Sequence, residues 1–189
     1  MKWLWVLTSL LLLAGCAVSP QQISIVPQSE QSMPMASAGR DVLNIRVIDA
    51  RPSPVLGTLG GTYNDSSTLS ASNDIIADLE QLLGNRLAAA GYRLVSSPDA
   101  IEFRVTLEQL DYQRVSGTLA SEVQVRAVLS LVVDDGRRFI ERTYRSSTLQ
   151  TRITRPTATD NKAFLEEVLT SSLDRLLQDA SVHEFLAMP

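Results

Sequence analysis

Residues 121–136, SEVQVRAVLSLVVDDG, contain the longest regular alternation of apolar and polar side chains in this 189-residue chain. Because successive side chains of a strand point to opposite faces, this alternation predicts a strand with one buried face. The Asp135-Gly136 pair at its end favours a type I′ hairpin turn, with a return strand over about residues 138–153. We therefore expect a β-sheet with one apolar face and one solvated face.

Two amphipathic helices flank this part of the sequence. Residues 75–90 carry apolar side chains three and four positions apart, after a predicted N-cap at Ser72 or Asn73. Gly91 then predicts a left-handed C-terminal cap. A second apolar stripe predicts another helix over about residues 161–180.

Shorter alternating stretches predict further strands. They lie at residues 43–47, 68–71, 92–95 and 101–112, and the last one changes phase near Glu108-Gln109, which predicts a β-bulge. The sequence thus predicts a single α+β domain over residues 41–189. We expect an antiparallel sheet of about four to five strands with both helices packed on one face.

The first sixteen residues carry a targeting signal. Lys2 precedes an apolar run over residues 3–14, which is shorter than the roughly twenty residues that cross a bilayer. The run ends in Leu13, Ala14, Gly15 and Cys16, a stretch that resembles the lipobox of bacterial lipoproteins. We therefore predict a signal peptide over 1–15 and a lipid on Cys16, against the alternative of an ordinary secretory signal with a chance cysteine.

Residues 16–40 differ in composition from the rest of the chain. They are rich in Gln, Ser and Pro and show no sustained periodicity, which is typical of a disordered tether. Such a coil would span about 27 Å and hold the domain away from the membrane. The alternative is that residues 23–26 add an edge strand to the sheet.

Composition excludes several classes of function. The chain is 44% hydrophobic, has a formal net charge of −4, and contains one cysteine and one histidine. The acidic balance argues against nucleic-acid binding, and the single cysteine argues against disulfides and multi-cysteine zinc sites. We expect no metal and no cofactor.

Nothing in the sequence favours catalysis. His183 stands in a terminal helical turn, where a packing or capping role is expected. The Gly57–Gly61 stretch lacks the Lys-Ser/Thr of a phosphate loop and predicts a flexible loop. The acidic pairs at 134–135 and 166–167 are explained by a turn and by a solvated helix face. We predict that the protein is not an enzyme.

Arginines are the main candidates for binding. Six of them surround the last predicted strand, and Arg142 and Arg152 are an even number of positions apart, which places them on one face of a strand. With Arg145 they form a possible docking surface for an envelope protein or a peptidoglycan-like anionic polymer. The alternative is a charged strand that only resists edge-to-edge pairing.

Four features together carry a resemblance to a known family. These are the lipobox, the helix entry at 68–74, the helix exit at 89–92 and the tail at 181–185, and they resemble the YajG family of bacterial lipoproteins. The resemblance implies a diacylglycerol and a third fatty acyl chain on Cys16. Ala17 stands where lipoproteins of the inner membrane typically carry Asp, which implies the periplasmic side of the outer membrane.

Two classes of function remain open. The first is a lipid-anchored, non-enzymatic interaction or adaptor module for cell-envelope components, which binds through its open sheet face or an exposed strand. The second is a ligand-binding or enzymatic domain with a cleft between the helices and the sheet. We favour the first.

Overall fold

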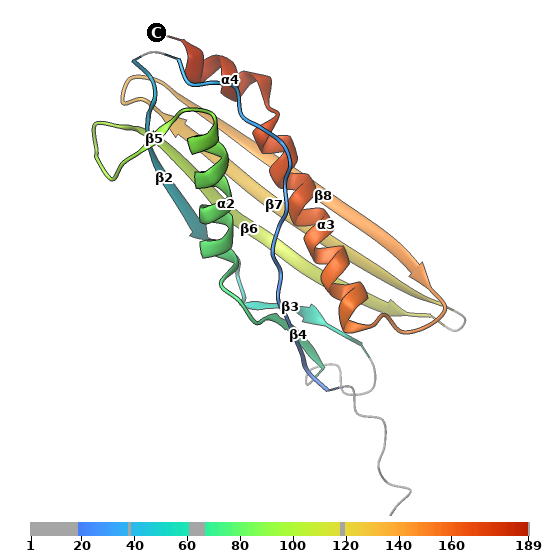
Figure 1. Ribbon diagram of the computed structural model, residues 1–189. Helices are drawn as coiled ribbons and strands as arrows, with labels where there is room; N and C mark the ends of the chain where they lie inside the picture. Colours follow the sequence, from blue (N-terminus) through green and yellow to red (C-terminus); the bar gives the residue numbers. More distant parts are fainter. Residues whose placement is uncertain (1–18, 38, 61–66, 118–119, 189) are drawn as a thin grey trace, which may run out of the picture.

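Three long strands form the antiparallel ribbon that the sequence predicts (Figure 1). β6 (Ile101–Ser116) pairs with β7 (Ser121–Asp134), which pairs with β8 (Phe139–Arg152). The register between β6 and β7 shifts at Leu107/Gln109, which confirms the predicted bulge. The computed structural model describes residues 19–37, 39–60, 67–117 and 120–188.

The five shorter strands lie along the other edge of β6 or beyond it. β2 (Val42–Asp49) runs parallel to the first half of β6, and β5 (Arg93–Leu94) lies outside β2. β3 (Val55–Thr58) runs parallel to the end of β6, and it is followed outward by β4 (Thr68–Ala71) and β1 (Gln21–Ile23).

The described residues therefore form a mixed sheet of eight strands, with four parallel and three antiparallel pairings. The prediction of an antiparallel sheet with four to five strands is wrong in both number and direction. Alternation reveals which residues are buried and carries no information on strand direction. The long connection from β2 to β6, which contains α2 (Ile75–Ala89), lets these strands run parallel as neighbours.

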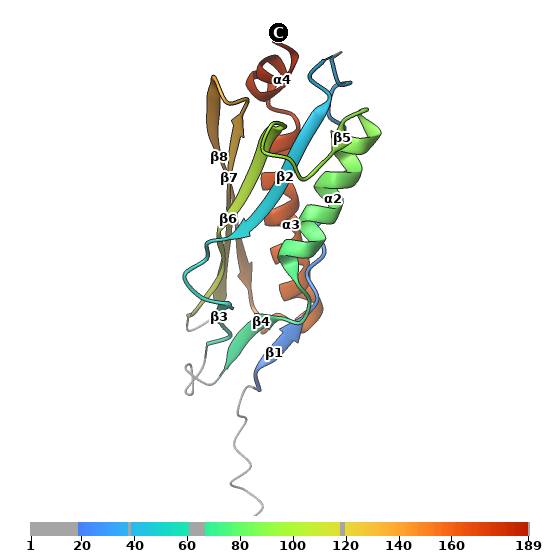
Figure 2. The ribbon, with the colours of Figure 1, turned by 90° about the vertical axis from the view of Figure 1, so that its left-hand side faces the viewer.

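The two predicted helices do cover one face of the sheet, as Figure 2 shows. α2 begins after Asp74, whose carboxylate accepts from two backbone N–H groups, so the N-cap lies one or two residues later than predicted. Gly91 has a φ of 89° and ends α2 as predicted. α3 (Ala158–Leu177) is followed by α4 (Ala180–Ala187), where a short terminal turn was expected.

β3 was not predicted, because two prolines precede it and glycine favours loops. Gly57 is needed there for a different reason. A Cβ atom on this residue would lie 1.8 Å from the carbonyl oxygen of Tyr112, so only glycine lets β3 approach β6. The predicted flexible loop is therefore wrong at Gly57, while residues 61–66 lie outside the described residues.

The hairpin between β7 and β8 turns at Gly136 and Arg137. The backbone N–H of Asp135 donates to the carbonyl of Arg138 at 3.1 Å. Gly136 has a φ of 79°, and no described non-glycine residue has a positive φ. Because a type I′ turn needs positive φ at both central residues, that prediction is wrong.

Residues 19–37 lie on the domain and form what we call the N-terminal strap. The strap runs between α2 and α3 on the helix side of the sheet (Figure 1). Ile23, Ile25 and Met33 are buried, and β1 lies within the strap. The predicted disordered tether over 16–40 is therefore wrong for these residues, and the alternative of an added strand is confirmed at Ile23.

Side chains from both helices hold the backbone of the strap. Asn73, just before α2, accepts from the N–H of Ile25 and donates to its carbonyl, both at 2.8 Å. On α3, Glu166 accepts from the N–H of Val26 at 2.9 Å. These bonds satisfy backbone N–H and C=O groups of the strap much as a neighbouring strand would. The strap therefore needs few apolar side chains to stay in place.

Candidate interaction surface

β8 is the outer edge of the sheet. Within the described part of the chain its sole strand partner is β7, so its other side presents backbone groups without a strand partner. The carbonyl of Arg145 accepts from Nη1 of Arg175 at 2.8 Å, on the side away from β7. Since the N–H and C=O of one residue point the same way in an antiparallel strand, the odd-numbered residues of β8 present their backbone outward.

Side-chain guanidinium groups protect part of this edge. Besides Arg145, the carbonyl of Glu141 accepts from Nη1 of Arg142 at 3.0 Å. Neither contact reaches the second half of β8. There Leu149 is 61% exposed on the open face of the sheet.

Arg142 and Arg152 share one face of β8, as their spacing predicted. That face is the helix side, because they pair with Leu131 and Ser121, and the buried Leu131 faces the helices. Arg145 pairs with Val128 and lies on the opposite, open face. The three predicted docking residues are therefore not brought together.

Arg142 belongs to a polar cluster between β8 and α4. Its Nε donates to the hydroxyl of Ser181 at 3.0 Å and lies 3.8 Å from Oδ2 of Asp179. The hydroxyl of Tyr144 donates to the same Oδ2 at 2.8 Å. Burial would raise the pKa of Asp179, but hydrogen bonds from Ser181 and Tyr144 outweigh it and lower this pKa.

The pKa of Tyr144 is shifted in the direction opposite to that of Asp179. Burial and then the carboxylate of Asp179 raise the pKa of its phenol well above the ordinary range, so it stays a donor. The cluster has a clear structural role, which is to join α4 to the edge strand. Arg142 is engaged in that contact.

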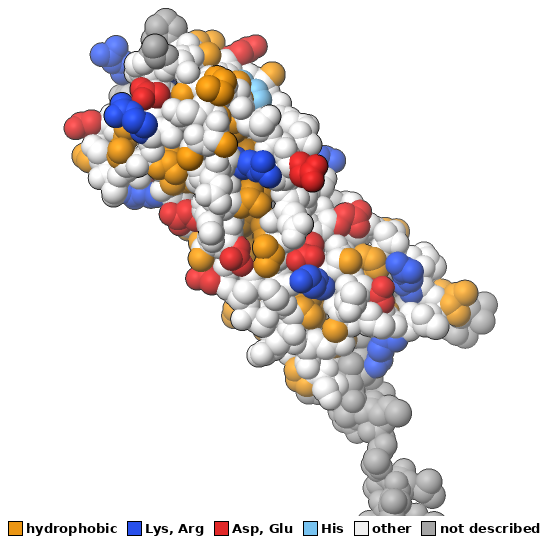
Figure 3. Space-filling view, viewed as in Figure 1, with side chains coloured by type: hydrophobic (Ala, Val, Ile, Leu, Met, Phe, Trp, Pro, Cys, Tyr) orange, Lys and Arg blue, Asp and Glu red, His pale blue; other side chains and the backbone are white. Residues whose placement is uncertain are grey.

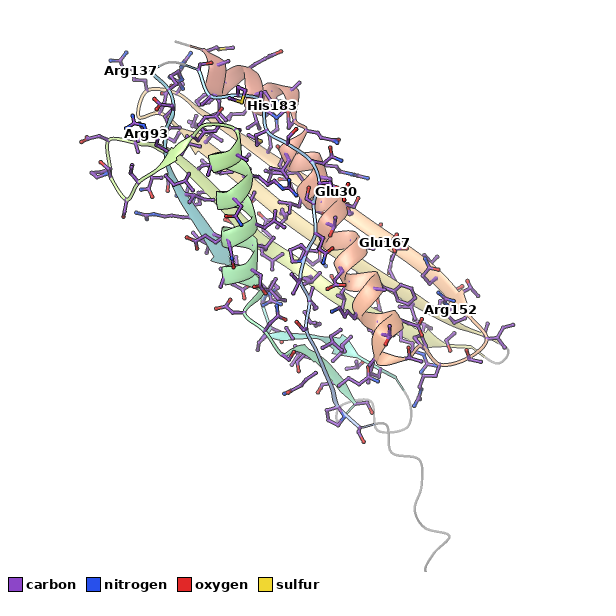
Figure 4. All side chains as sticks on the ribbon, in the orientation of Figure 1. Glu30, Arg93, Arg137, Arg152, Glu167 and His183 are labelled. Carbon is purple, nitrogen blue, oxygen red and sulfur yellow. The ribbon has the colours of Figure 1, made fainter. Side chains whose placement is uncertain are left out.

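Arg152 lies at the far end of β8, where it stacks over the ring of Phe164 at 5.4 Å. Figure 4 shows Arg152 and Arg137 at opposite ends of the molecule. At the Arg137 end, the carboxylate of Asp135 accepts from Nη2 of both Arg40 and Arg138 at 3.1 Å. The arginines around β8 thus divide into separate groups rather than one patch.

The remaining predicted features are structural or outside the described residues. Nε2 of His183 lies 2.7 Å from the carbonyl oxygen of Leu177, which supports the packing interpretation. Glu166 binds the strap and pairs with Lys162 at 3.5 Å, so it is not simply solvated. The lipobox, Leu13 to Cys16, lies outside the described residues.

The predicted alternative, a cleft between helices and sheet, is filled by the strap. Ile25 is fully buried, and the strap to which it belongs runs between α2 and α3 (Figure 1). Open recesses flank the strap on each side, one lined by Val26 and Arg86 and the other by Gln28 and Glu167. Every second residue of the strap from Ile23 to Ser29 is buried, but in the sequence only Ile23 and Ile25 carry this alternation as apolar side chains.

Two further properties of the described residues bear on the site. No described helix is both long and apolar enough to span a membrane. No group of three or more His, Cys, Asp or Glu side chains in the described ranges is placed to share a metal ion.

Comparisons with known proteins bear on the family. A family model described as uncharacterized lipoprotein, Lipoprotein_16, matches residues 27–187. The chain is 25% identical to the uncharacterized lipoprotein YajG of Escherichia coli (strain K12), over 98% of this chain and 96% of that protein.

One solved structure with a TM-score above 0.5 supports the fold. Protein XCC0632 from Xanthomonas campestris superposes with a TM-score of 0.51 at 12% identity, over 88% of this chain and 95% of that one. A minor lipoprotein from Acinetobacter baumannii matches at a TM-score of 0.40 and 19% identity, over 78% of this chain and 93% of that one. The predicted resemblance to YajG is confirmed, and the chain belongs to the Lipoprotein_16 family of membrane-anchored bacterial lipoproteins.

Proposed function

We propose that this lipoprotein is a non-enzymatic interaction module, which binds an extended segment of another cell-envelope protein along the edge of β8. The observation that carries the proposal is the open edge of this 14-residue strand. An extended peptide can add to such an edge through backbone hydrogen bonds, while side-chain contacts set its specificity.

The second half of β8 is the part best suited to pairing. Proteins usually protect edge strands with charges, prolines or a covering element, and Arg142 and Arg175 do so at Glu141 and Arg145. Residues 147–151 lack such a cover among the described residues and include the exposed Leu149. We place the contact there.

The strap supports this choice over the ligand-binding or enzymatic alternative. The strap occupies the space between α2 and α3 and leaves open recesses on its two sides, which favours docking over a ligand-binding cleft. A binding partner is then left with the outer surfaces of the sheet and its edge. The proposed mechanism is docking alone, with no reaction.

The proposed anchor is an acylated Cys16, and the proposed location is the periplasmic side of the outer membrane. Ala17 at the position after the cysteine supports export from the inner membrane. In fractionated cells, we expect the protein in the outer-membrane fraction and its Cys16→Ala variant in the soluble fraction. A variant that stays in the membrane would contradict the anchor.

Photocrosslinking in cells tests the proposed edge. A photoreactive residue at Leu149 should capture one specific envelope protein, whereas the same residue at the exposed Glu80 on α2 should not. Ser147→Pro removes an outward N–H and leaves the β7 ladder intact, so it should abolish capture at position 149. Ser147→Ala is the matched control, and capture that survives Ser147→Pro would refute pairing at this edge.

A further inference from the structure

The strap leaves a short connection between Cys16 and the folded domain. Ser19 lies three residues after Cys16, and β1 begins at Gln21. A fully extended chain spans at most about 3.6 Å per residue, so Ser19 lies within about 11 Å of Cys16. A lipid on Cys16 would therefore hold the β1 end of the domain at the bilayer surface.

Several elements meet at this end. β1 lies there with the end of β6, the start of β7, the end of β8 and the first turn of α3, as Figures 1 and 2 show. Ser121 of β7 pairs with both Ser116 and Arg152, which places the three long strands side by side. The opposite end carries α4 and the hairpin at Gly136.

The surface of this end combines positive charge with exposed apolar side chains. We call it the basic end and define it by Arg114, Val115, Arg152, Ile153 and Arg155. Ile153 is 89% exposed and Val115 is 57% exposed. Figure 3 shows basic and hydrophobic side chains near one another where the sheet ends beside α3.

The arginines of the basic end have no ion-pair partner in the described part of the fold, although the guanidinium of Arg114 donates to the carbonyl of Leu59 at 2.9 Å and to the hydroxyl of Ser121 at 2.6 Å. None of its three arginines lies within ion-pair distance of a described carboxylate. Burial and then the nearby charge of Arg155 lower the pKa of Arg114. Of the carboxylates near this end, Asp160 is engaged in the capping box of α3 with Thr157, and Glu122 is exposed on the open face.

We propose that the basic end docks on anionic phospholipid headgroups, so that the sheet stands on the bilayer with its hairpin end pointing away. This inference rests on the lipid anchor of the proposed function. Guanidinium groups bind phosphate oxygens through paired hydrogen bonds, and exposed Ile and Val side chains suit the headgroup region. Docking in this way leaves the edge of β8 uncovered and places residues 147–151 next to the headgroups, so a protein partner would pair with this edge at the membrane surface.

Fluorescence quenching in vesicles tests the orientation. Cys16 is the sole cysteine of the chain and would be consumed by the lipid, so an introduced cysteine takes a single fluorophore. We would place it at the exposed Thr154 or, as the matched control, at Arg137. The two sites are separated by about 46 Å along the 14 residues of β8, at about 3.3 Å per residue.

The lipidated full-length protein is reconstituted in vesicles that contain phosphatidylglycerol and a headgroup quencher. We expect strong quenching at position 154 and little at 137. The orientation would be overturned if both sites were quenched equally. It would also be overturned if neither site were quenched while the protein stayed with the vesicles. Protein that does not float with the vesicles would instead refute the anchor, so the two failures are distinguishable.

Charge variants test headgroup recognition. The double variant Arg152→Gln with Arg155→Gln should lower the affinity of the docked state for anionic vesicles about fivefold for each arginine removed. High salt should also weaken the docked state. The matched control is Arg46→Gln with Arg137→Gln, which removes the same charge from exposed positions elsewhere. Thermal unfolding of each variant checks that the fold is intact. The role of the arginines would be overturned if quenching at position 154 were as strong in neutral vesicles as in phosphatidylglycerol vesicles and were unchanged in Arg152→Gln with Arg155→Gln.

Discussion

The two ends of the β6–β8 ribbon satisfy their arginines in different ways. At the hairpin end, Arg40 and Arg138 share the carboxylate of Asp135, and both lie within 6 Å of the ring centroid of Phe185, at 5.8 and 5.5 Å. At the basic end, Arg152 also stacks on an aromatic ring but has no described carboxylate partner. The hairpin end uses its charges to fasten the fold through a carboxylate, whereas at the basic end Arg152 and Arg155 are exposed and have no ion-pair partner among the described residues.

This contrast separates structural arginines from candidate binding arginines. Removing a guanidinium that is paired and half-buried lowers the free energy of unfolding of the protein. Removing an exposed, unpaired guanidinium lowers it little. Sequence position does not distinguish the two kinds. Unfolding free energies of variants at the two ends test this contrast.

The largest effect is expected at Asp135, at the hairpin end. Its side chain is 6% exposed and accepts from two backbone N–H groups as well as from Arg40 and Arg138. Asp135→Ala leaves these donors without their acceptor and should cost about 2–4 kcal/mol. Urea unfolding of the two proteins measures this cost, and a loss below 1 kcal/mol would show that the end is not fastened here.

The same carboxylate predicts a pH dependence. Hydrogen bonds from the backbone of Arg138 and Arg137 and from the arginine side chains lower the pKa of Asp135, against the opposing effect of burial. A lowered pKa in the folded state stabilises the fold above the unfolded value near 4, and this stability is lost as the pH falls below it. The stability difference between wild type and Asp135→Ala should therefore shrink as the pH falls below about 4.

Asn73 is expected to give the next largest effect, because it fixes the strap that brings the basic end close to Cys16. Asn73→Ala leaves the N–H and C=O of the buried Ile25 without their partners, at a cost of about 2 kcal/mol. Limited proteolysis should then cut first within residues 19–37. If the variant resisted proteolysis as well as the wild type does, Ile25 and the contacts to α3 would be sufficient to hold the strap.

Periodicity predicted the regular elements but not the strap. The helix stripes, the β7 alternation and the bulge at Leu107/Gln109 are strong local signals, and the structure confirms them. In the strap, the buried positions include Pro27 and Ser29, which have no hydrophobic signature. The hydroxyl of Ser29 is satisfied by Asp174 of α3, a contact that exists only in the folded chain.

The face of the β8 arginines was unpredictable for a related reason. The even spacing of Arg142 and Arg152 correctly placed them on one face of β8, but the helix-side positions of β8 also include Ser146 and Thr148. An edge strand only partly covered by a helix needs no apolar stripe, so its inner and outer faces look alike in sequence. Parallel pairing of β2 with β6 has no local signature at all.

The smallest stability effect is expected at the basic end itself. Arg152→Ala removes a stacking contact with Phe164 from an exposed arginine, and it should cost at most about 1 kcal/mol. Arg40→Ala is the matched comparison, because Arg40 also stacks on a phenylalanine but is paired with a buried carboxylate. We expect urea unfolding to show the larger loss for Arg40→Ala. Equal losses would mean that Arg152 is a structural residue, and the charge it carries would then need no membrane to explain it.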